Sequence, residues 1–303
     1  MNVWGRNPSI IKEINKFREN RQYLPGIQLP KNIQFIDNLK EATKNSKEIL
    51  IVTPSKGFRN ILLDLKTLNR QFDICWATKG LEIDTGFLPH NICEEIFGQN
   101  QNMAVISGPS FALEVAQKKP TAVTVASNNI KFSKHIASSL SDINFRAYTS
   151  NDITGVEIGG AIKNILAIGA GISDGLNYGD NARIALINRG LVEMQRLGVS
   201  LGANKNTFLG LSGMGDLVLT CTSNLSRNRR FGLSIAAGNS ISKARNDIDQ
   251  VVEGIDATAA VFNLSKKMNI EMPICKTIYR IVFDNLKPSL AVEELMSRAL
   301  QAE

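Results

Sequence analysis

Short apolar runs alternate with longer amphipathic stretches through the first half of the chain. The run Glu48-Ile-Leu-Ile-Val-Thr53 contains four successive apolar residues, which is typical of a strand buried on both faces. Helical periodicity appears between such runs, as in Phe58–Asn69 and Ser110–Lys118. Alternation at this spacing predicts βαβ units and a mostly parallel sheet. The predicted strands are Ile33–Ile36, Glu48–Thr53, Phe72–Ala77, Met103–Ser107, Thr121–Ala126 and Asn144–Tyr148.

The second half of the chain has a different pattern. From Asp152 onward, apolar residues recur at helical spacing between glycines and polar loops, and no segment has convincing strand character. We therefore predict an α/β domain at residues 1–150 and an all-helical domain at residues 151–303. The join between them, near Ser150 and Asn151, is short.

The chain opens on Val3-Trp4, which is typical of the last part of a strand. A turn follows, in which Asn7 suits the N-cap of a helix and Pro8 suits its first position. We therefore expect the sequence to begin inside a strand, with an earlier part of the sheet absent.

The composition is ordinary for a soluble globular protein, with 43% hydrophobic and 21% charged residues. No long apolar run opens the chain, so a signal peptide is not expected and the cytoplasm is the natural location. The most apolar stretch, Ile153–Ile172, contains Glu157, Lys163 and Asn164. These polar residues argue against a membrane span.

The cysteine and histidine content disfavours two kinds of chemistry. The four cysteines form no close pair and only two histidines exist, so neither a zinc site nor a disulfide framework is indicated. His90 and His135 lie in segments that resemble ordinary helices, which argues against a Ser-His-Asp or Cys-His mechanism.

The net charge of +7 is compatible with a lysine-rich surface that keeps the protein soluble. It is equally compatible with an anionic partner such as nucleic acid, a phosphorylated metabolite or a dinucleotide. No basic run is interleaved with aromatic residues, so the pattern disfavours nucleic acid.

Three polar clusters follow predicted strands, at the edge where ligands bind to an open parallel sheet. They are Thr53-Pro54-Ser55, Thr78-Lys79-Gly80 and Ser107-Gly108-Pro109-Ser110. The last is predicted to open a helix and so to offer unpaired N–H groups to an anion. Each cluster alone is better explained as a turn, because Gly, Pro and Ser are common turn residues.

Lys163 lies on a helix face made otherwise of glycine and alanine, with Gly155, Gly159, Ala167 and Gly171 at four-residue spacing. Small residues indicate that another segment approaches this face closely. A lysine confined there would have a lowered pKa and would suit acid–base work. The alternative is a lysine whose amine reaches solvent from a helix contact.

A third candidate region combines Leu211-Ser-Gly-Met-Gly-Asp216 with Ser226-Arg-Asn-Arg-Arg-Phe-Gly232. The glycines permit a tight backbone course around Asp216. Ser226 suits an N-cap, which places Arg227 at a helix start and makes a good phosphate site. The alternative is a capped surface helix with a solvated basic end. Together these residue types suit reduction of a phosphorylated ketone, which needs a proton donor and cations for the phosphate.

The sequence resembles the bacterial NAD(P)-dependent glycerol-3-phosphate dehydrogenases, and the likeness covers essentially the whole chain in order. The motifs that carry it are Thr78–Glu82, Val105–Ala112, Gly160–Asn164, Gly210–Thr222, Asn224–Gly232, Val251–Gly254 and Met272–Ile274. The resemblance implies a Rossmann-like domain followed by an all-α domain. It also implies interconversion of dihydroxyacetone phosphate and sn-glycerol 3-phosphate with NAD(P)H or NAD(P)+ for glycerophospholipid synthesis, no metal, and a homodimer.

The resemblance also assigns roles to individual residues. The proton-transfer lysine corresponds to Lys163. The substrate contacts correspond to Lys79, Gly108, Ser110, Lys163, Asp216, Ser226, Arg227 and Asn228. The cofactor contacts correspond to Arg6, Tyr23, Lys79, Ala112, Arg227, Val251 and Glu253. Arg6 follows the strand where NAD-specific proteins carry an acidic residue, and an arginine there accommodates the 2′-phosphate of NADP; the alternative is a solvated turn residue.

The family begins with a strand, a G-x-G-x-x-G turn and a helix, and nothing similar precedes Val3. We therefore expect the first βα unit, and with it the turn that carries the cofactor's pyrophosphate, to be missing. Two interpretations stay open: an oxidoreductase whose amino-terminal segment is lost, or a non-catalytic, decaying remnant. A nucleic-acid binder has only the net charge in its favour.

Overall fold

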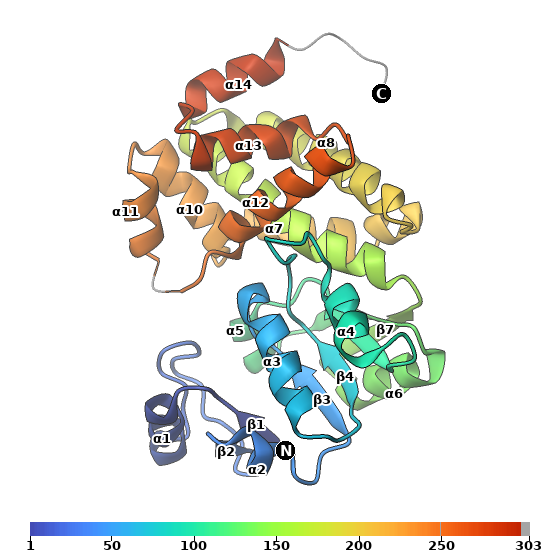
Figure 1. Cartoon of the computed structure of the whole chain (residues 1–303). Coiled ribbons are helices and arrows are strands. Elements are labelled where there is room, and N and C mark those ends of the chain that lie inside the picture. Colours follow the sequence, from blue (N-terminus) through green and yellow to red (C-terminus); the bar gives the residue numbers. More distant parts are fainter. Residues whose placement is uncertain (249, 298–303) are drawn as a thin grey trace.

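The computed structural model describes residues 1–248 and 250–297. The first half is an α/β unit and the second half is helical, and the two lie at opposite ends of the molecule in Figure 1. The predicted fold class, a Rossmann-like α/β domain followed by helices, is confirmed.

The strands form two separate sheets. Strands β1 (Asn2–Trp4) and β2 (Gln34–Ile36) pair in parallel. The larger sheet has the order β3-β4-β5-β6-β7. Its strands are β3 (Glu48–Ile51), β4 (Asp73–Trp76), β5 (Met103–Ser107), β6 (Thr121–Ser127) and β7 (Phe145–Ser150). All pairs in it are parallel except β5 with β6, so a mostly parallel sheet is confirmed.

The helices of the first half pack beside these strands (Figure 1). They are α1 (Pro8–Phe17), α2 (Leu39–Thr43), α3 (Ser55–Thr67), α4 (Pro89–Phe97), α5 (Ala112–Ala116) and α6 (Ile130–Leu140). The Asn7 side chain caps α1 by accepting hydrogen bonds from Ser9 N and Ile10 N, as predicted. The predicted helix over Ser110–Lys118 is wrong at both ends, because α5 has five residues and begins at Ala112.

Helix α7 (Ile153–Gly175) is the core of the second half. It is long and apolar enough to cross a membrane, but its most apolar window is entirely buried inside the protein. Other helices surround it, namely α8 (Gly179–Ser200), α9 (Asp216–Thr222), α10 (Arg227–Ala236), α11 (Ile241–Asn246), α12 (Glu253–Lys267), α13 (Pro273–Phe283) and α14 (Pro288–Met296).

The small residues of α7 allow these close contacts. A Cβ atom at Gly159 would overlap the carbonyl of Ser212, and one at Gly171 would overlap the carbonyl of Arg229. Backbone therefore packs against backbone on the face that carries Lys163, and the predicted close approach is confirmed. A 3₁₀ turn (Lys205–Leu209) and a π turn (Leu211–Gly215) supply one of the approaching segments.

Two strand edges face no other described strand. β1 pairs only with β2, and β3 pairs only with β4. Along β3 and just after it, Leu50 and Val52 are 52% and 70% exposed. Large apolar side chains at a sheet edge are unusual, since such an edge invites pairing with another strand.

Candidate functional site

Three charged side chains meet at the boundary between the two halves. Lys79 Nζ donates to Asp216 Oδ2 at 2.7 Å, and Lys163 Nζ donates to Asp216 Oδ1 at 2.5 Å. Lys79 belongs to the α/β half, whereas Lys163 and Asp216 belong to the helical half. One carboxylate therefore joins two lysines that lie far apart in the sequence.

Local structure explains why these residues meet. Lys79 follows β4, at the carboxyl end of a parallel strand, where ligands bind in open α/β sheets. Lys163 lies at the middle of α7, opposite the π turn that leads into Asp216. Single π turns are frequent at functional sites. Thr220, one helical turn after Asp216 on α9, accepts a second hydrogen bond from Lys163 Nζ at 3.1 Å.

Burial and mutual charge set the protonation of this cluster. Burial and, to a smaller extent, the Lys79 charge lower the pKa of Lys163 to about 8, against the attraction of Asp216. Burial alone would lower the pKa of Lys79 too, but the adjacent Asp216 carboxylate raises it. Burial opposes ionisation of Asp216, yet the two lysines lower its pKa. At neutral pH Lys79 and Asp216 are thus charged, and Lys163 can both give and take a proton.

A second hydrogen-bonded network adjoins the charged cluster at Asn164, the next residue of α7. The Asn228 side chain donates to Asn164 Oδ1 at 2.9 Å and accepts from Gly254 N at 2.9 Å. Asn164 also donates to Glu253 Oε2 at 3.3 Å. These contacts hold the first residues of α10 and α12 against α7. They bring Asn228 and Glu253, both predicted site residues, close to Lys163.

The start of α10 carries an unengaged arginine. The Ser226 hydroxyl accepts from Arg229 N at 3.2 Å and is the N-cap, as predicted. Arg229 pairs with Asp174 at 2.6 Å. The guanidinium of Arg227, by contrast, has no ion pair or hydrogen-bond partner among residues 1–248 and 250–297. Arg227 is therefore available to an anion at this helix start.

The loop after β5 differs from its prediction. Residues 107–110 do not open a helix, because α5 begins two residues later; the predicted cradle of helix N–H groups is therefore wrong. Ser110 Oγ donates to the carbonyl of Gly108 at 3.0 Å. Gly108 has φ +150°, and a Cβ there would lie 2.9 Å from Val123 Cα, so only glycine fits. Pro109 lies beside Gly215, so this loop contacts the π turn that precedes Asp216.

Two buried hydroxyl groups near the strand ends have no hydrogen-bond partner among the described residues: Thr53 Oγ1 and Ser107 Oγ. They follow β3 and end β5, on either side of the β4 strand that leads to Lys79. A Cβ at Gly160 would lie 3.2 Å from Ser107 Oγ and 3.4 Å from Lys79 Cγ. Unpaired buried hydroxyls at this edge fit a polar ligand that completes their hydrogen bonding.

The other predicted cofactor residues lie at the outer parts of the site. Arg6 is exposed after β1, and Tyr23 is exposed between α1 and β2. Ala112 is exposed at the start of α5, and Val251 is exposed just before α12. In the described part of the chain, no hydrogen bond or ion pair connects these four to the lysine cluster.

Sequence reasoning missed Thr220 and the role of Asn164 as a link. Both lie inside motifs that were singled out, but neither was assigned a function. The available signal was spacing: Thr220 is four residues after Asp216 on a helix, and such pairs share a face. Asn164 directly follows Lys163, a position from which a helical side chain points to a different neighbour.

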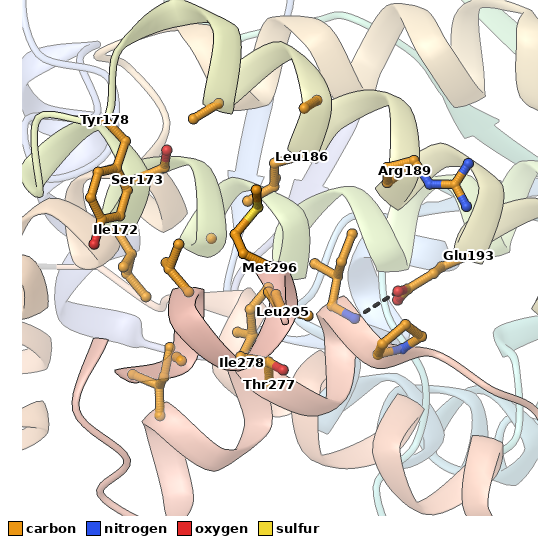
Figure 2. A pocket seen from close by; sticks show the side chains of 18 of the residues that line it. Ile172, Ser173, Tyr178, Leu186, Arg189, Glu193, Thr277, Ile278, Leu295 and Met296 are labelled. Carbon is orange, nitrogen blue, oxygen red and sulfur yellow. Dashed lines mark hydrogen bonds between the residues drawn. The ribbon is translucent and has the colours of Figure 1, made fainter. Parts of the chain in front are cut away.

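A mostly apolar pocket lies elsewhere in the helical half. It has a volume of about 590 Å³ and is lined mainly by residues of α7, α8, α13 and α14. Figure 2 shows its aliphatic lining and, at one end, Glu193 accepting a hydrogen bond from the backbone of α13. None of the predicted site residues lines it. The described residues contain no group of three or more His, Cys, Asp or Glu side chains able to hold a metal ion.

Comparison with known proteins agrees with this geometry. The family described as NAD-dependent glycerol-3-phosphate dehydrogenase matches at both ends: its N-terminal part at residues 1–133 and its C-terminal part at residues 152–293. Glycerol-3-phosphate dehydrogenase (NAD(P)+) of Psychromonas ingrahamii is 48% identical over 303 residues, covering 99% of this chain and 91% of the relative.

Solved structures lead to the same family. The glycerol-3-phosphate dehydrogenase of Coxiella burnetii has a TM-score of 0.95 and 44% identity, covering 98% of this chain and 91% of that one. The Saccharomyces cerevisiae enzyme shares the fold, with a TM-score of 0.83 at 24% identity over 98% of this chain and 90% of that one. Likeness of this extent gives no support to a non-catalytic remnant. The chain belongs to the NAD-dependent glycerol-3-phosphate dehydrogenase family.

Proposed function

We propose that this oxidoreductase interconverts dihydroxyacetone phosphate and sn-glycerol 3-phosphate with NAD(P)H or NAD(P)+, for glycerophospholipid synthesis. The observation that carries the proposal is the Lys79–Asp216–Lys163 cluster at the carboxyl edge of the sheet. A ketone reduction needs a proton donor beside the developing alkoxide, and a lysine with a pKa of about 8 is suited to that task in both directions.

Each residue of the site has a distinct part in this proposal. Lys163 gives its proton to the substrate oxygen in reduction and takes it back in oxidation. Asp216 and Thr220 hold the Lys163 amine in place. Lys79 stays charged and stabilises the negative oxygen as it forms. The remaining predicted contacts to the substrate are Gly108, Ser110, Ser226, Arg227 and Asn228.

Arg227 binds the substrate phosphate in this scheme. Its guanidinium has no protein partner in the described chain and projects from a helix start. A planar guanidinium can donate two parallel hydrogen bonds to a phosphate, and the helix dipole favours an anion at the same place. Ser226 and Asn228 flank it and orient the helix start through their own hydrogen bonds.

The residues present fit the nicotinamide end of the cofactor. When bound, NAD(P)H supplies the hydride for the substrate carbonyl. The hydroxyls of Thr53 and Ser107, buried and without a partner among the described residues, would complete their hydrogen bonding there. The predicted cofactor contacts are Lys79, Arg227 and Glu253 here, with Arg6, Tyr23, Ala112 and Val251 at the outer parts. Arg6, exposed after β1, suits the 2′-phosphate of NADP.

We further propose that one more parallel strand pairs between β1 and β3. Those two edges have no partner among the described strands, and Leu50 and Val52 are exposed there. The resemblance implies a strand that continues into a G-x-G-x-x-G turn and a helix, which would hold the pyrophosphate. The extended chain is this sequence joined at its amino end to such a strand, turn and helix.

The domain division, the cellular location and the oligomeric state complete the proposal. The division between the cofactor domain and the substrate domain lies at residues 150 and 151, between β7 and α7. The protein acts in the cytoplasm without inserting into a membrane, which the complete burial of the apolar window of α7 supports. The active species is a homodimer that binds no nucleic acid.

Dihydroxyacetone phosphate reduction by the purified extended chain tests this function directly, with NADPH oxidation followed by absorbance. The expected result is turnover that depends on the phosphate, with unphosphorylated dihydroxyacetone reduced far more slowly. Equal rates with both ketones, or no turnover, would overturn the proposed substrate.

A further inference from the structure

A buried carboxylate of the helical half is held entirely by the α/β half. Glu157 lies on α7 and is 4% exposed. Its Oε1 accepts from Trp76 Nε1 at 3.0 Å and from His90 N at 3.1 Å, and its Oε2 accepts from His90 Nδ1 at 2.5 Å. Trp76 ends β4 and His90 is in the first turn of α4. A three-donor cradle of this kind is a directional attachment between two packed elements.

We infer that Glu157 is a positioning residue, which fixes the catalytic helix α7 against β4 so that Lys163 and Lys79 meet at Asp216. Trp76 is three residues before Lys79, and Glu157 is six residues before Lys163. Two short segments, one leading from Trp76 to Lys79 and the other from Glu157 to Lys163, are thus joined at their first residues by the Trp76–Glu157 hydrogen bond. The inference rests on the proposed role of Lys163.

The other contacts at this end of α7 do not fix its orientation so tightly. Ile153 and Val156 pack in the apolar cluster that contains Trp76 and Val105. Apolar packing is favourable but non-directional, and it tolerates a small rotation or slide of the helix. The Asp152 cap bonds to Gly155 N, Asn204 N and Thr207 Oγ1, all within the helical half.

The geometry gives the size of the effect. Six residues of α-helix span ~9 Å, so a tilt of ~5° about Glu157 would move the Lys163 backbone by about 0.8 Å. A displacement near 1 Å at a reacting group can cost ~10²-fold in rate. Glu157→Gln would loosen the attachment and allow such a tilt, because the three hydrogen bonds lose the carboxylate charge and the new NH₂ group requires His90 Nδ1 to become an acceptor.

The side chains around Glu157 take no part in the proposed reaction. Burial opposes protonation of His90, but the Glu157 carboxylate raises its pKa, and Glu94 adds to that effect. Cys93 is buried beside them with its pKa raised to about 12 by burial. Trp76 is fully buried. The cluster is closed to substrate, so Glu157 acts through α7 and not on a ligand.

The matched control is Glu193→Gln. Glu193 is 3% exposed and also accepts backbone N–H groups at a helix start, from Ile274 at 2.6 Å and Cys275 at 3.0 Å. Its partners all lie within the helical half (Figure 2). Both substitutions remove a buried charge from a helix start, so both should lower Tm. Only Glu157→Gln disturbs the contact between the two halves.

Kinetics of the extended chain give the first readout. Glu157→Gln should lower kcat at least ~10-fold, leave KM for dihydroxyacetone phosphate within ~3-fold, and raise the primary isotope effect with deuterated NADPH. Glu193→Gln should keep kcat per folded molecule within about twofold, because the displacement argument does not apply to it. Equal losses of kcat in both variants, or none in Glu157→Gln, would overturn the inference.

The second readout needs neither cofactor nor turnover. Reductive methylation of Lys163 with formaldehyde, followed by peptide mass spectrometry across pH, reports the midpoint at which this amine loses its proton. A displaced Lys163 gains water and leaves Asp216, and since burial is the largest cause of its low pKa, the midpoint should rise. Simple loss of the Glu157 charge would lower it instead. An unchanged or lowered midpoint would overturn the inference even if the proposed substrate were wrong.

Trp76→Phe covers the case in which Glu157→Gln does not fold. It removes one of the three donors and keeps an aromatic ring in the core. The midpoint should again rise and kcat should fall by ~3-fold or more, and wild-type values for both would refute the positioning role.

Discussion

Replacing Lys163 with alanine should remove the proton donor while leaving the rest of the site in place. Lys163 Nζ is 2.5 Å from Asp216 Oδ1 and 3.1 Å from Thr220 Oγ1, and the alanine variant has no amine at that position. Asp216 keeps its 2.7 Å bond to Lys79. The carboxylate is therefore not left uncompensated, and the fold should tolerate the change better than the ~3–5 kcal/mol that an orphaned buried charge costs.

The expected loss is set by general acid catalysis. A positioned proton donor contributes ~10²–10⁴-fold in rate, which corresponds to about 2.7–5.4 kcal/mol of activation free energy at ~1.36 kcal/mol per tenfold. We expect kcat of Lys163→Ala in the extended chain to fall by at least ~10²-fold, with KM for NADPH little changed. Rates would be followed by NADPH absorbance, with circular dichroism as the check on folding.

Two controls separate chemistry from structure. Lys163→Met keeps the volume of the side chain and removes the amine, so it should lose as much kcat as the alanine variant. Added methylamine should partly restore the alanine variant, where a cavity is open, and not the methionine variant. A Lys163→Ala enzyme with kcat within about threefold of wild type would refute the role, because loss of a general acid costs ~10²-fold or more.

Three further outcomes are expected. The reduction rate should fall as the pH rises through about 8, because reduction needs a protonated Lys163. The oxidation rate should fall as the pH drops below about 8, because oxidation needs a neutral Lys163, and a pH profile of kcat in each direction checks both expectations. Arg227→Lys should raise KM for dihydroxyacetone phosphate by ~10-fold, since a point charge replaces a planar fork; an equal effect on unphosphorylated dihydroxyacetone would place Arg227 elsewhere. The 303-residue chain should bind NADPH far more weakly and melt lower than the extended chain, because the edges of β1 and β3 have no partner among the described strands; micromolar binding by fluorescence titration with equal Tm would contradict the extra strand.

Periodicity predicted the first half well because its strands are short, apolar and separated by clear breaks. Met103–Ser107 is predicted to the residue, and the others differ by a few positions at their ends. The antiparallel pairing of β5 with β6 was not predictable, because strand direction depends on how the chain returns and not on side-chain alternation. The start of α5 at Ala112 was missed for a related reason, since Gly108 packs against Val123 across the sheet and holds the loop extended.

The site was predictable where local spacing carries the information. The four-residue recurrence around Lys163 indicated a closely approached face, and the approaching backbone at Ser212 is where that pattern requires it. The Asp216 bridge between Lys79 and Lys163 was not predictable from spacing, because it joins three separate segments. Glu157 was noted only as a polar residue in an apolar stretch, which says that it needs a partner and not which one.

The shared carboxylate explains why the site is assembled from both halves. Lys79 and Lys163 would repel each other at this range, and burying two ammonium groups without a counter-charge is very costly. Asp216 compensates for both, but only when the halves are packed together. Separation of the halves would leave Asp216 with Lys163 alone and would return Lys79 to solvent. The low pKa of Lys163 depends on burial and on the Lys79 charge, so the proposed proton donor acquires this pKa in the assembled site.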